Sequence, residues 1–288
     1  FKRTGQEFSF IQNKAFKQLI SKAVAENQLY FSVANTMNES VCTEAMKFFT
    51  ESIVFSREFE DIPGQIRFNY NNNNVLKSMK QYAQRADVGI IDMKFDMKNT
   101  EIDVDDTIPE NAPPELSRAL KSFVSALSDN SQAKIQRNEI KARTYHTGVN
   151  KKGELGQYEL SLEDESDGTH RLMALAPAID RVIDNGGIFV ADELEKGLHP
   201  LLTEYIVNKF QNSEINKNHA QLIFTTHDTE IMRQHFLDAD QFYFVDKDRQ
   251  TGESELYSVD GLGKKSNADI RTGYLIGKFG GIPELGDE

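Results

Sequence analysis

Gly187-Ile-Phe-Val-Ala-Asp-Glu-Leu-Glu-Lys-Gly-Leu-His-Pro200 is the stretch that decides the fold of this chain. A short apolar run ends in two adjacent carboxylates, Asp192 and Glu193, and a turn then leads to a proline that can open a helix. The run predicts a buried strand with both acids at its carboxyl end. In an open α/β sheet ligands bind at that edge, so the acids can meet a metal ion and a phosphate. A solvated loop is the alternative explanation.

A second apolar run, Ala220-Gln-Leu-Ile-Phe-Thr-Thr-His-Asp228, carries His227 at its end. Between the two runs, residues 200–210 have the apolar spacing of an amphipathic helix. A strand, a helix and a strand in this order give parallel neighbours. We therefore expect His227 to emerge at the same sheet edge as Asp192 and Glu193. A purely structural histidine is the alternative.

Upstream, a polar turn opens a helical pattern. Ser166, Asp167, Gly168 and Thr169 precede apolar residues at helical spacing, which are Leu172, Met173, Leu175, Ala176, Ile179 and Val182. The amides at the start of a helix can bind an anion. A plain N-cap formed by Ser166 or Asp167 explains the same residues without any ligand.

The remainder of the chain predicts mixed helices and strands. We expect helices over residues 13–27, 44–55, 75–86 and 116–127, an acidic loop over 100–114, and strands over 88–95, 141–149, 157–162, 241–246 and 254–259. The first residues resemble part of a hairpin, and a Gly-rich segment from Gly273 is expected to pack as a closing element. The one concentrated basic stretch is a solvated face or a nucleic-acid strip, and it contains Lys134, Arg137, Lys141 and Arg143.

Composition limits the classes of protein that fit. The 288 residues are 39% hydrophobic and 27% charged, as in globular proteins, and their formal net charge is −12. Such a surface repels a polyanion except at a local basic strip. The single cysteine, Cys42, excludes a disulfide framework and a cysteine-built zinc site. No apolar run has membrane-spanning length and no leader pattern is present, so we expect a soluble cytoplasmic protein without a membrane partner.

Taken together, the three turns resemble the carboxyl-terminal half of the nucleotide-binding domain of ABC-type ATPases. Ser166-Asp167-Gly168 is similar to the signature loop, 188–193 to the Walker B strand, 196–200 to the D-loop and Thr225-Thr226-His227 to the switch histidine. Within that class the sequences of these turns are similar to those of the RecF- and SMC-like branch. They are most similar to the AAA_21 family, whose members are often found in bacterial phage-defence systems. The close resemblance covers residues 144–285.

The resemblance implies a set of roles in the binding of ATP and Mg²⁺. Asp192 would hold magnesium through water, Glu193 would activate the attacking water, and His227 would donate to the γ-phosphate. Ser166, Asp167 and the amide of Gly168 would belong to the loop that reaches ATP bound on a second subunit. Lys196 and His199 would line the interface of that sandwich homodimer or higher oligomer.

The sequence also departs from the pattern of the larger class. Glu165 and Asp167 replace an apolar residue and a glycine of the usual signature, so an additional carboxylate is expected to face ATP, and His199 stands where many relatives have an acid. No Gly-x-x-x-x-Gly-Lys-Ser/Thr run occurs, and Gly261-Leu-Gly-Lys-Lys-Ser266 has the wrong spacing. We expect the lobe with the phosphate loop to lie outside this numbering, before Phe1.

These features predict an α/β fold of the ABC-type P-loop NTPase class, a mainly parallel sheet flanked by helices, with a helical subdomain in the first half. Residues 1–139 would form the helical, lobe-insertion region and 140–288 the carboxyl-terminal ATPase core. The predicted function is an ATPase whose dimerisation gates a partner effector, a nuclease or toxin, in antiphage defence. A RecF-like DNA-repair ATPase and a non-hydrolysing scaffold are the alternatives.

Overall fold

The computed structural model describes residues 2–59, 61–87, 89–103, 113–127, 134–248, 250–259 and 267–282. The chain forms two compact units, each assembled from segments that are separated in the sequence. The first unit contains Phe1–Glu58, Ala178–Leu194 and Glu204–Glu288, and the second contains Phe59–Pro177 and Glu195–Thr203. The predicted boundary at residue 140 falls inside a strand of the second unit, and the division into 1–139 and 140–288 stays a prediction.

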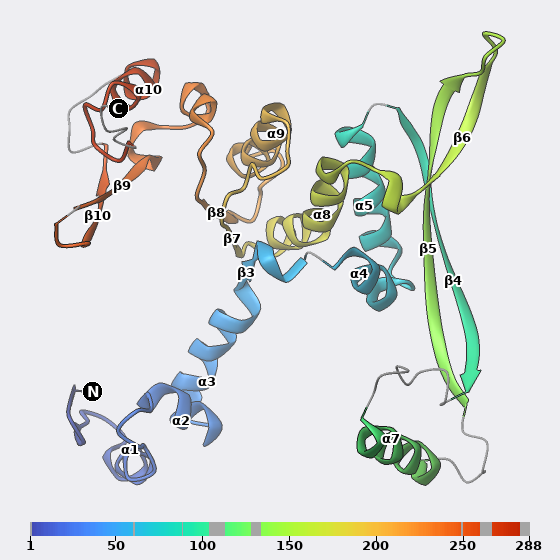
Figure 1. The fold of residues 1–288 in the computed structure, drawn as a ribbon. Helices are drawn as coiled ribbons and strands as arrows, with labels where there is room; N and C mark the ends of the chain where they lie inside the picture. Colours follow the sequence, from blue (N-terminus) through green and yellow to red (C-terminus); the bar gives the residue numbers. More distant parts are fainter. Residues whose placement is uncertain are drawn as a thin grey trace. The chain divides into compact units, whose positions relative to one another are not determined.

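A parallel sheet organises the first unit. Its order is β3-β7-β8, with β3 at Ile53–Phe55, β7 at Ile188–Ala191 and β8 at Gln221–Phe224 (Figure 1). The middle strand, β7, pairs in parallel with both neighbours. Helix α9 (Pro200–Gln211) connects β7 to β8. The expected strand, helix and strand order is confirmed, and this part of the chain is α/β.

Helix α8 (Asp167–Asn185) leads into β7 and buries its apolar side as the sequence predicts. The buried residues include all six of the expected positions, Leu172, Met173, Leu175, Ala176, Ile179 and Val182. On the polar side Lys209 of α9 donates from Nζ to Asp180 Oδ1 of α8 at 2.6 Å. This ion pair holds the crossover helix against α8 in the first unit.

The predicted helix over residues 44–55 is wrong at its carboxyl end, over 53–55. Helix α3 covers only Ser40–Lys47, a π-helical turn, η1, follows at Phe48–Ser52, and the chain then becomes β3. Val54 is buried there and pairs with Phe189 of β7. A three-residue apolar run fits either period, and here pairing with a strand far along the chain decides between them.

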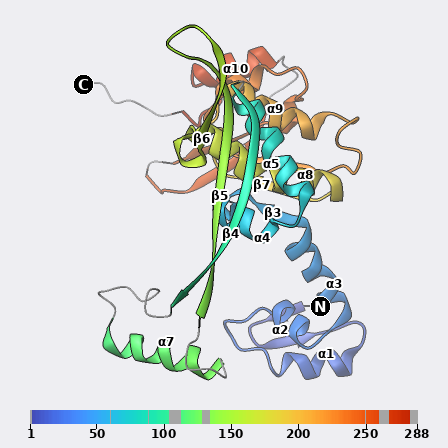
Figure 2. The ribbon, with the colours of Figure 1, turned by 90° about the vertical axis from the view of Figure 1, so that its right-hand side faces the viewer.

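The amino-terminal part of the first unit is a hairpin followed by short helices (Figure 2). The expected hairpin is formed by β1 (Lys2–Thr4) and β2 (Glu7–Ser9), and α1 (Lys14–Ser21) and α2 (Tyr30–Thr36) follow. The predicted helix over 13–27 is therefore shorter than expected, and α2 was not expected. Their shared core contains Phe10, Ile20, Val24, Tyr30 and Ala34.

The second unit contains an antiparallel sheet in the order β4-β5-β6, with β4 at Ile90–Asp103, β5 at Lys134–Val149 and β6 at Leu155–Ser161 (Figure 1). The hairpin expected between 141–149 and 157–162 is confirmed. Strand β4 continues to Asp103, so the start of the predicted acidic loop is strand, while 104–112 lie outside the described residues. Turn η3 (Leu162–Asp164) leads from β6 to α8.

Three further helices belong to the second unit. They are α4 (Ile62–Asn69), which was not expected, α5 (Asn73–Ala86) and α7 (Pro114–Leu127). Asp61 caps α4 through the amide of Gly64, and Asn72 accepts from the amide of Asn74 at the start of α5. The core of this unit packs α4, α5 and α8 on the sheet, with Ile66, Met79, Met93, Leu162 and Met173 among its buried residues.

The carboxyl-terminal part of the first unit closes on an aromatic cluster. After η4 (Thr229–Arg233) and η5 (Ala239–Gln241), β9 (Tyr243–Lys247) and β10 (Ser254–Ser258) form a hairpin, and α10 (Asn267–Leu275) follows. The ring of Phe244 stacks on Tyr274 and Phe279, with centroids 4.9 and 5.8 Å away. The expected packed closing segment is confirmed as far as residue 282, and the run from Gly261 to Ser266 lies outside the described residues.

Within the described ranges no helix combines the length and the apolar character that crossing a membrane requires.

Candidate functional site

Two carboxylates stand at the carboxyl end of β7, as the sequence predicts. Asp192 and Glu193 follow the buried residue Ala191, and the Asp192 residue is exposed. The backbone of Glu193 is left-handed, with φ of 47°. This conformation costs a non-glycine residue about 1–2 kcal/mol, and strain of this kind concentrates at functional sites. It turns the chain sharply, directly after the strand.

Thr225 at the end of β8 holds the acidic turn in place. Its Oγ1 accepts from the Glu193 amide at 2.8 Å and donates to Asp192 Oδ1 at 2.6 Å. Its carbonyl oxygen accepts from the amide of Leu194 at 3.1 Å. One threonine therefore orients the Asp192 carboxylate and stabilises the strained turn at Glu193.

His227 lies at the same edge as the two acids. Its Nε2 is 3.6 Å from Glu193 Oε1, and the His227 and Glu193 side chains are 86% and 46% exposed. That separation is longer than a hydrogen bond, so the two side chains lie close together without a hydrogen bond between them. Asp192, Glu193 and His227 are thus brought together, as expected from parallel strands, on a surface that a ligand can reach.

The chemistry of these residues fits a nucleotide with magnesium. Mg²⁺ is commonly held in such sites by one or two carboxylates, by water and by the phosphates of the substrate. Asp192 supplies such a carboxylate, with Oδ1 oriented by Thr225. Among the described residues no group of three or more His, Cys, Asp or Glu side chains could hold a metal by itself.

The other predicted residues lie in the second unit. Ser166 caps α8, because its Oγ accepts from the amide of Thr169 at 3.1 Å and lies 2.9 Å from the Thr169 hydroxyl. Thr169 is buried, so its hydroxyl can donate to Ser166 and leave the Ser166 O–H directed to an acceptor outside the loop. The expected N-cap is present, and it is compatible with an anion contact. Asp167 is exposed in the first turn of α8.

Gly168 lies against the turn that contains Lys196 and Gly197. A Cβ at position 168 would be 2.8 Å from the backbone oxygen of Gly197, closer than side chains approach backbone. Lys196 and His199 in this turn are exposed, and His199 Nδ1 accepts from the amide of Leu201 at 3.2 Å. Within the second unit the structure therefore joins the loop at Ser166 to the turn before α9.

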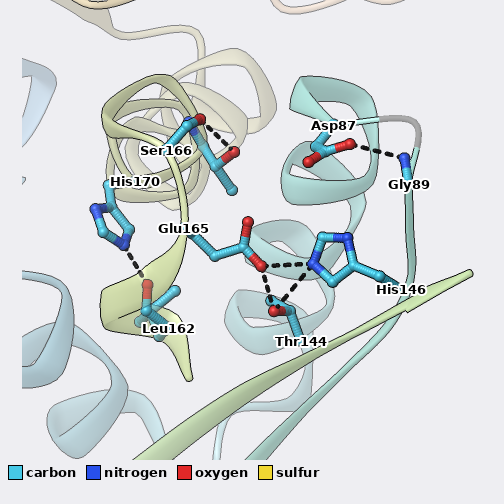
Figure 3. A network of polar contacts seen from close by, with 9 residues as sticks. Asp87, Gly89, Thr144, His146, Leu162, Glu165, Ser166 and His170 are labelled. Carbon is cyan, nitrogen blue, oxygen red and sulfur yellow. Dashed lines mark hydrogen bonds and ion pairs between the residues drawn. The ribbon is translucent and has the colours of Figure 1, made fainter. Parts of the chain in front are cut away.

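Glu165 does not present its carboxylate to solvent, so of the two acids that depart from the usual signature only Asp167 is exposed at this turn. Its side chain is 3% exposed and points to β5, where Oε1 contacts His146 Nε2 at 2.7 Å and accepts from the Thr144 hydroxyl (Figure 3). A buried carboxylate needs partners, and these two supply them. With Glu165 buried, Ser166 and Asp167 are exposed at this turn and Gly168 is half-buried.

The basic stretch does not form a free cationic strip over the part that is described. Arg143 lies between two carboxylates, with Nη1 3.2 Å from Glu159 Oε1 and Nη2 bonded to Asp96. These contacts raise the pKa of the Arg143 guanidinium and partly neutralise its field. Lys141 is exposed, while the side chains of Lys134 and Arg137 lie outside the described residues.

Sequence reasoning missed the residues that hold the site residues in place. Thr225 was visible as part of the run that ends in His227, but nothing in that run identifies Asp192 as its partner. Thr144 and His146 lie on the same side of β5, and the sequence could have indicated this, because residues two apart in a strand share a face. Their partner, Glu165, lies about twenty residues away, and its partnership required the tertiary structure.

Comparison with known families agrees with the geometry of the turns. The sequence model described as "AAA domain, putative AbiEii toxin, Type IV TA system", AAA_21, matches residues 25–233, which include every candidate site residue named above. No curated protein matches the chain. Because the match spans well over half of the 288 residues, the chain belongs to the AAA_21 family of P-loop NTPases.

Proposed function

We propose that this chain works in an ATP-hydrolysing protein of the ABC type. One observation carries the proposal, namely the convergence of Asp192, Glu193 and His227 at the ends of β7 and β8, where Thr225 bonds the Asp192 carboxylate and the Glu193 amide. A carboxylate for the metal, a carboxylate for water and a donor for phosphate are what phosphoryl transfer requires. The family to which the chain belongs binds nucleotides, which supports the same assignment.

In this proposal Glu193 acts as the general base. It orients a water molecule and takes its proton as the oxygen bonds to the γ-phosphorus of ATP, while the bond to the β,γ-bridging oxygen breaks and leaves ADP and phosphate. His227 donates from its ring to the γ-phosphate. Asp192 would hold Mg²⁺, which would neutralise part of the charge of the phosphates. A positioned general base contributes about 10²–10⁴-fold to the rate.

The proposed active form is a dimer that closes on ATP. Ser166, Asp167 and Gly168 of one copy would contact ATP held by the other, and Lys196 and His199 would line the contact. The 288 residues contain no Gly-x-x-x-x-Gly-Lys-Ser/Thr run, so the proposal includes a phosphate loop from another polypeptide segment, and the first half would act as the helical subdomain. Closure and release would gate a partner effector, a nuclease or toxin, in cytoplasmic antiphage defence, and the toxin-antitoxin wording of the family description supports that context.

The test is Glu193→Gln in the full-length gene product that carries this chain. We expect ATP hydrolysis to fall by about 10²–10⁴-fold while Mg·ATP binding persists and the dimer becomes more stable. The matched control is Glu214→Gln, an exposed acid in the loop between α9 and β8, which should leave turnover unchanged. Normal turnover of the Glu193 variant removes Glu193 from the role of base, and absence of any nucleotide binding favours a scaffold. Strong stimulation by DNA favours the RecF-like alternative.

A further inference from the structure

A buried polar cluster in the second unit lies directly beside the loop that carries Ser166. It consists of Thr144, His146 and Glu165 (Figure 3). Both contacts of the carboxylate use the same oxygen, since His146 Nε2 is 2.7 Å from Glu165 Oε1 and the Thr144 hydroxyl donates to that atom. The Thr144 and Glu165 side chains are almost completely buried. A buried carboxylate that loses such partners is destabilised, so the contacts hold the Glu165 side chain in one position.

The cluster does not have the arrangement of a hydrolytic triad. In a triad the imidazole lies between the hydroxyl and the acid. Here the hydroxyl of Thr144 bonds the carboxylate directly, and Thr144 is 0% exposed, so no substrate can reach it. These contacts and the burial of Thr144 indicate that the three residues have a structural role.

The sheet side of the cluster is the middle of the antiparallel sheet. Thr144 and His146 are two residues apart on β5 and therefore share a face. Thr144 stands opposite Met93 of β4 and Leu160 of β6. Since β5 is hydrogen-bonded on both sides, it is a rigid base for the carboxylate. The loop at Ser166 is thereby attached to the centre of the sheet.

The loop side of the cluster is held at a second point. The carbonyl oxygen of Leu162 accepts from the Glu165 amide at 3.1 Å, and the same oxygen lies 2.5 Å from His170 Nε2 (Figure 3). Leu162 itself is part of the core of this unit. Glu165 is thus fixed through its backbone and through its side chain, and Ser166 is the next residue along the chain.

We propose that Glu165 is a positioning residue for Ser166, and that the β4-β5-β6 sheet, through Thr144 and His146, fixes the place from which Ser166 contacts nucleotide. The inference rests on the proposed function, because it assigns Ser166 a contact to ATP. An error of about 1 Å in the placement of a binding group can cost about 10²-fold in rate. A side chain that removes such an error without contacting the substrate therefore has a measurable effect.

The test compares three variants of Glu165 in the full-length gene product. Glu165→Gln keeps one carbonyl oxygen, which can accept from both Thr144 and His146, so ATP-driven dimerisation and turnover should stay within about 3-fold of the parent protein. Glu165→Asp keeps the charge but withdraws it by one methylene, and Glu165→Ala removes it. Both should lose about 10–100-fold in ATP-driven dimerisation, with ATP binding to the single subunit unchanged. The matched control is Glu159→Ala, a half-exposed acid on β6, which should behave as the parent.

A second readout separates this inference from the proposed function. Hydrogen exchange of the peptide over residues 162–170 should accelerate in Glu165→Ala and Glu165→Asp but not in Glu165→Gln, whether or not the protein hydrolyses ATP. If the parent protein neither dimerises nor hydrolyses ATP, the proposed function fails. Independently of that result, unchanged hydrogen exchange in Glu165→Ala would show that the Glu165 side chain does not hold the loop. If the parent responds to ATP and Glu165→Ala matches it, the positioning role is wrong. If Glu165→Asp is active and Glu165→Gln is inactive, Glu165 acts through its charge, and the inference is overturned.

Discussion

The Thr225 hydroxyl donates to Asp192 Oδ1 at 2.6 Å and accepts from the Glu193 amide at 2.8 Å. One side chain at the end of β8 therefore holds the Asp192 carboxylate and the backbone of Glu193 at the end of β7. Because the two strands are parallel neighbours, Thr225 and Asp192 are adjacent only when this sheet is formed. The acidic pair is a product of the sheet as much as of the local turn.

Thr225→Val should weaken the site, because valine keeps the shape but loses both hydrogen bonds. With Asp192 as the proposed magnesium ligand, we expect turnover of ATP to fall by about 10–100-fold and the half-saturating Mg²⁺ concentration to rise. Thr225→Ser retains the hydroxyl and should recover most of the activity. Steady-state rates across a magnesium titration measure this, and equal rates for the valine and serine variants would contradict it.

Gly168→Ala should displace the loop at Ser166 from the turn at Gly197, because the new Cβ would be 2.8 Å from a backbone oxygen. Overpacking of this kind costs about 1–3 kcal/mol, and here the loop is expected to move rather than the sheet. ATP-driven dimerisation, followed by light scattering, should be lost or strongly reduced. Gly156→Ala on β6 is the control, since its nearest neighbour would be at an ordinary 3.7 Å. An alanine variant at 168 that dimerises normally would show that this approach is dispensable.

Cys42 should react slowly with maleimides or iodoacetamide in the folded protein. Burial, together with its contact to Glu39, raises the pKa of the thiol to about 11. At pH 8 the thiolate fraction is then roughly 10²-fold below that of an unperturbed thiol, and the rate should fall in proportion. Unfolding in guanidinium should restore the ordinary rate. Because Cys42 is the single cysteine, whole-protein mass spectrometry reports the reaction directly.

Glu39 should make the amino-terminal helices sensitive to acid. A hydrogen bond from the Cys42 amide, with Lys17 3.8 Å away, holds the pKa of this carboxyl below its usual value. A lowered folded pKa means that the ionised form stabilises the fold above the unfolded pKa, and that this contribution is lost as the pH falls through the folded pKa. Glu39→Gln keeps an acceptor but no charge.

For the Glu39→Gln variant we expect the free energy of unfolding to be about 1 kcal/mol lower than that of the parent at pH 7. Once the pH is below the folded pKa of Glu39, the two proteins should have the same free energy of unfolding. Urea unfolding followed by circular dichroism at a series of pH values measures both. A difference that stays constant from pH 7 to pH 3 would show that the charge of Glu39 is not the cause.

Local patterns were sufficient for several elements. The apolar runs that became β7 and β8, the helical spacing of α8 and the hairpin of β5 and β6 were all predicted, because period and turn residues are properties of neighbouring positions. The same patterns failed at Ile53–Phe55 and within residues 13–27. There the structure depends on pairing and packing with residues far along the chain.

The sequence by itself determined that two acids and a histidine follow two apolar runs that form strands, and that a polar turn with a serine opens a long helix. Only the tertiary structure decided that Thr225 bonds the Asp192 carboxylate and the Glu193 amide, and that Glu193 adopts a left-handed backbone. It also decided that the Glu165 side chain turns inward to Thr144 and His146. The physical reason is the separation along the chain of the residues that interact. Strand and helix periods are encoded within a few residues, whereas the partner of a buried polar group is chosen by the fold that buries it.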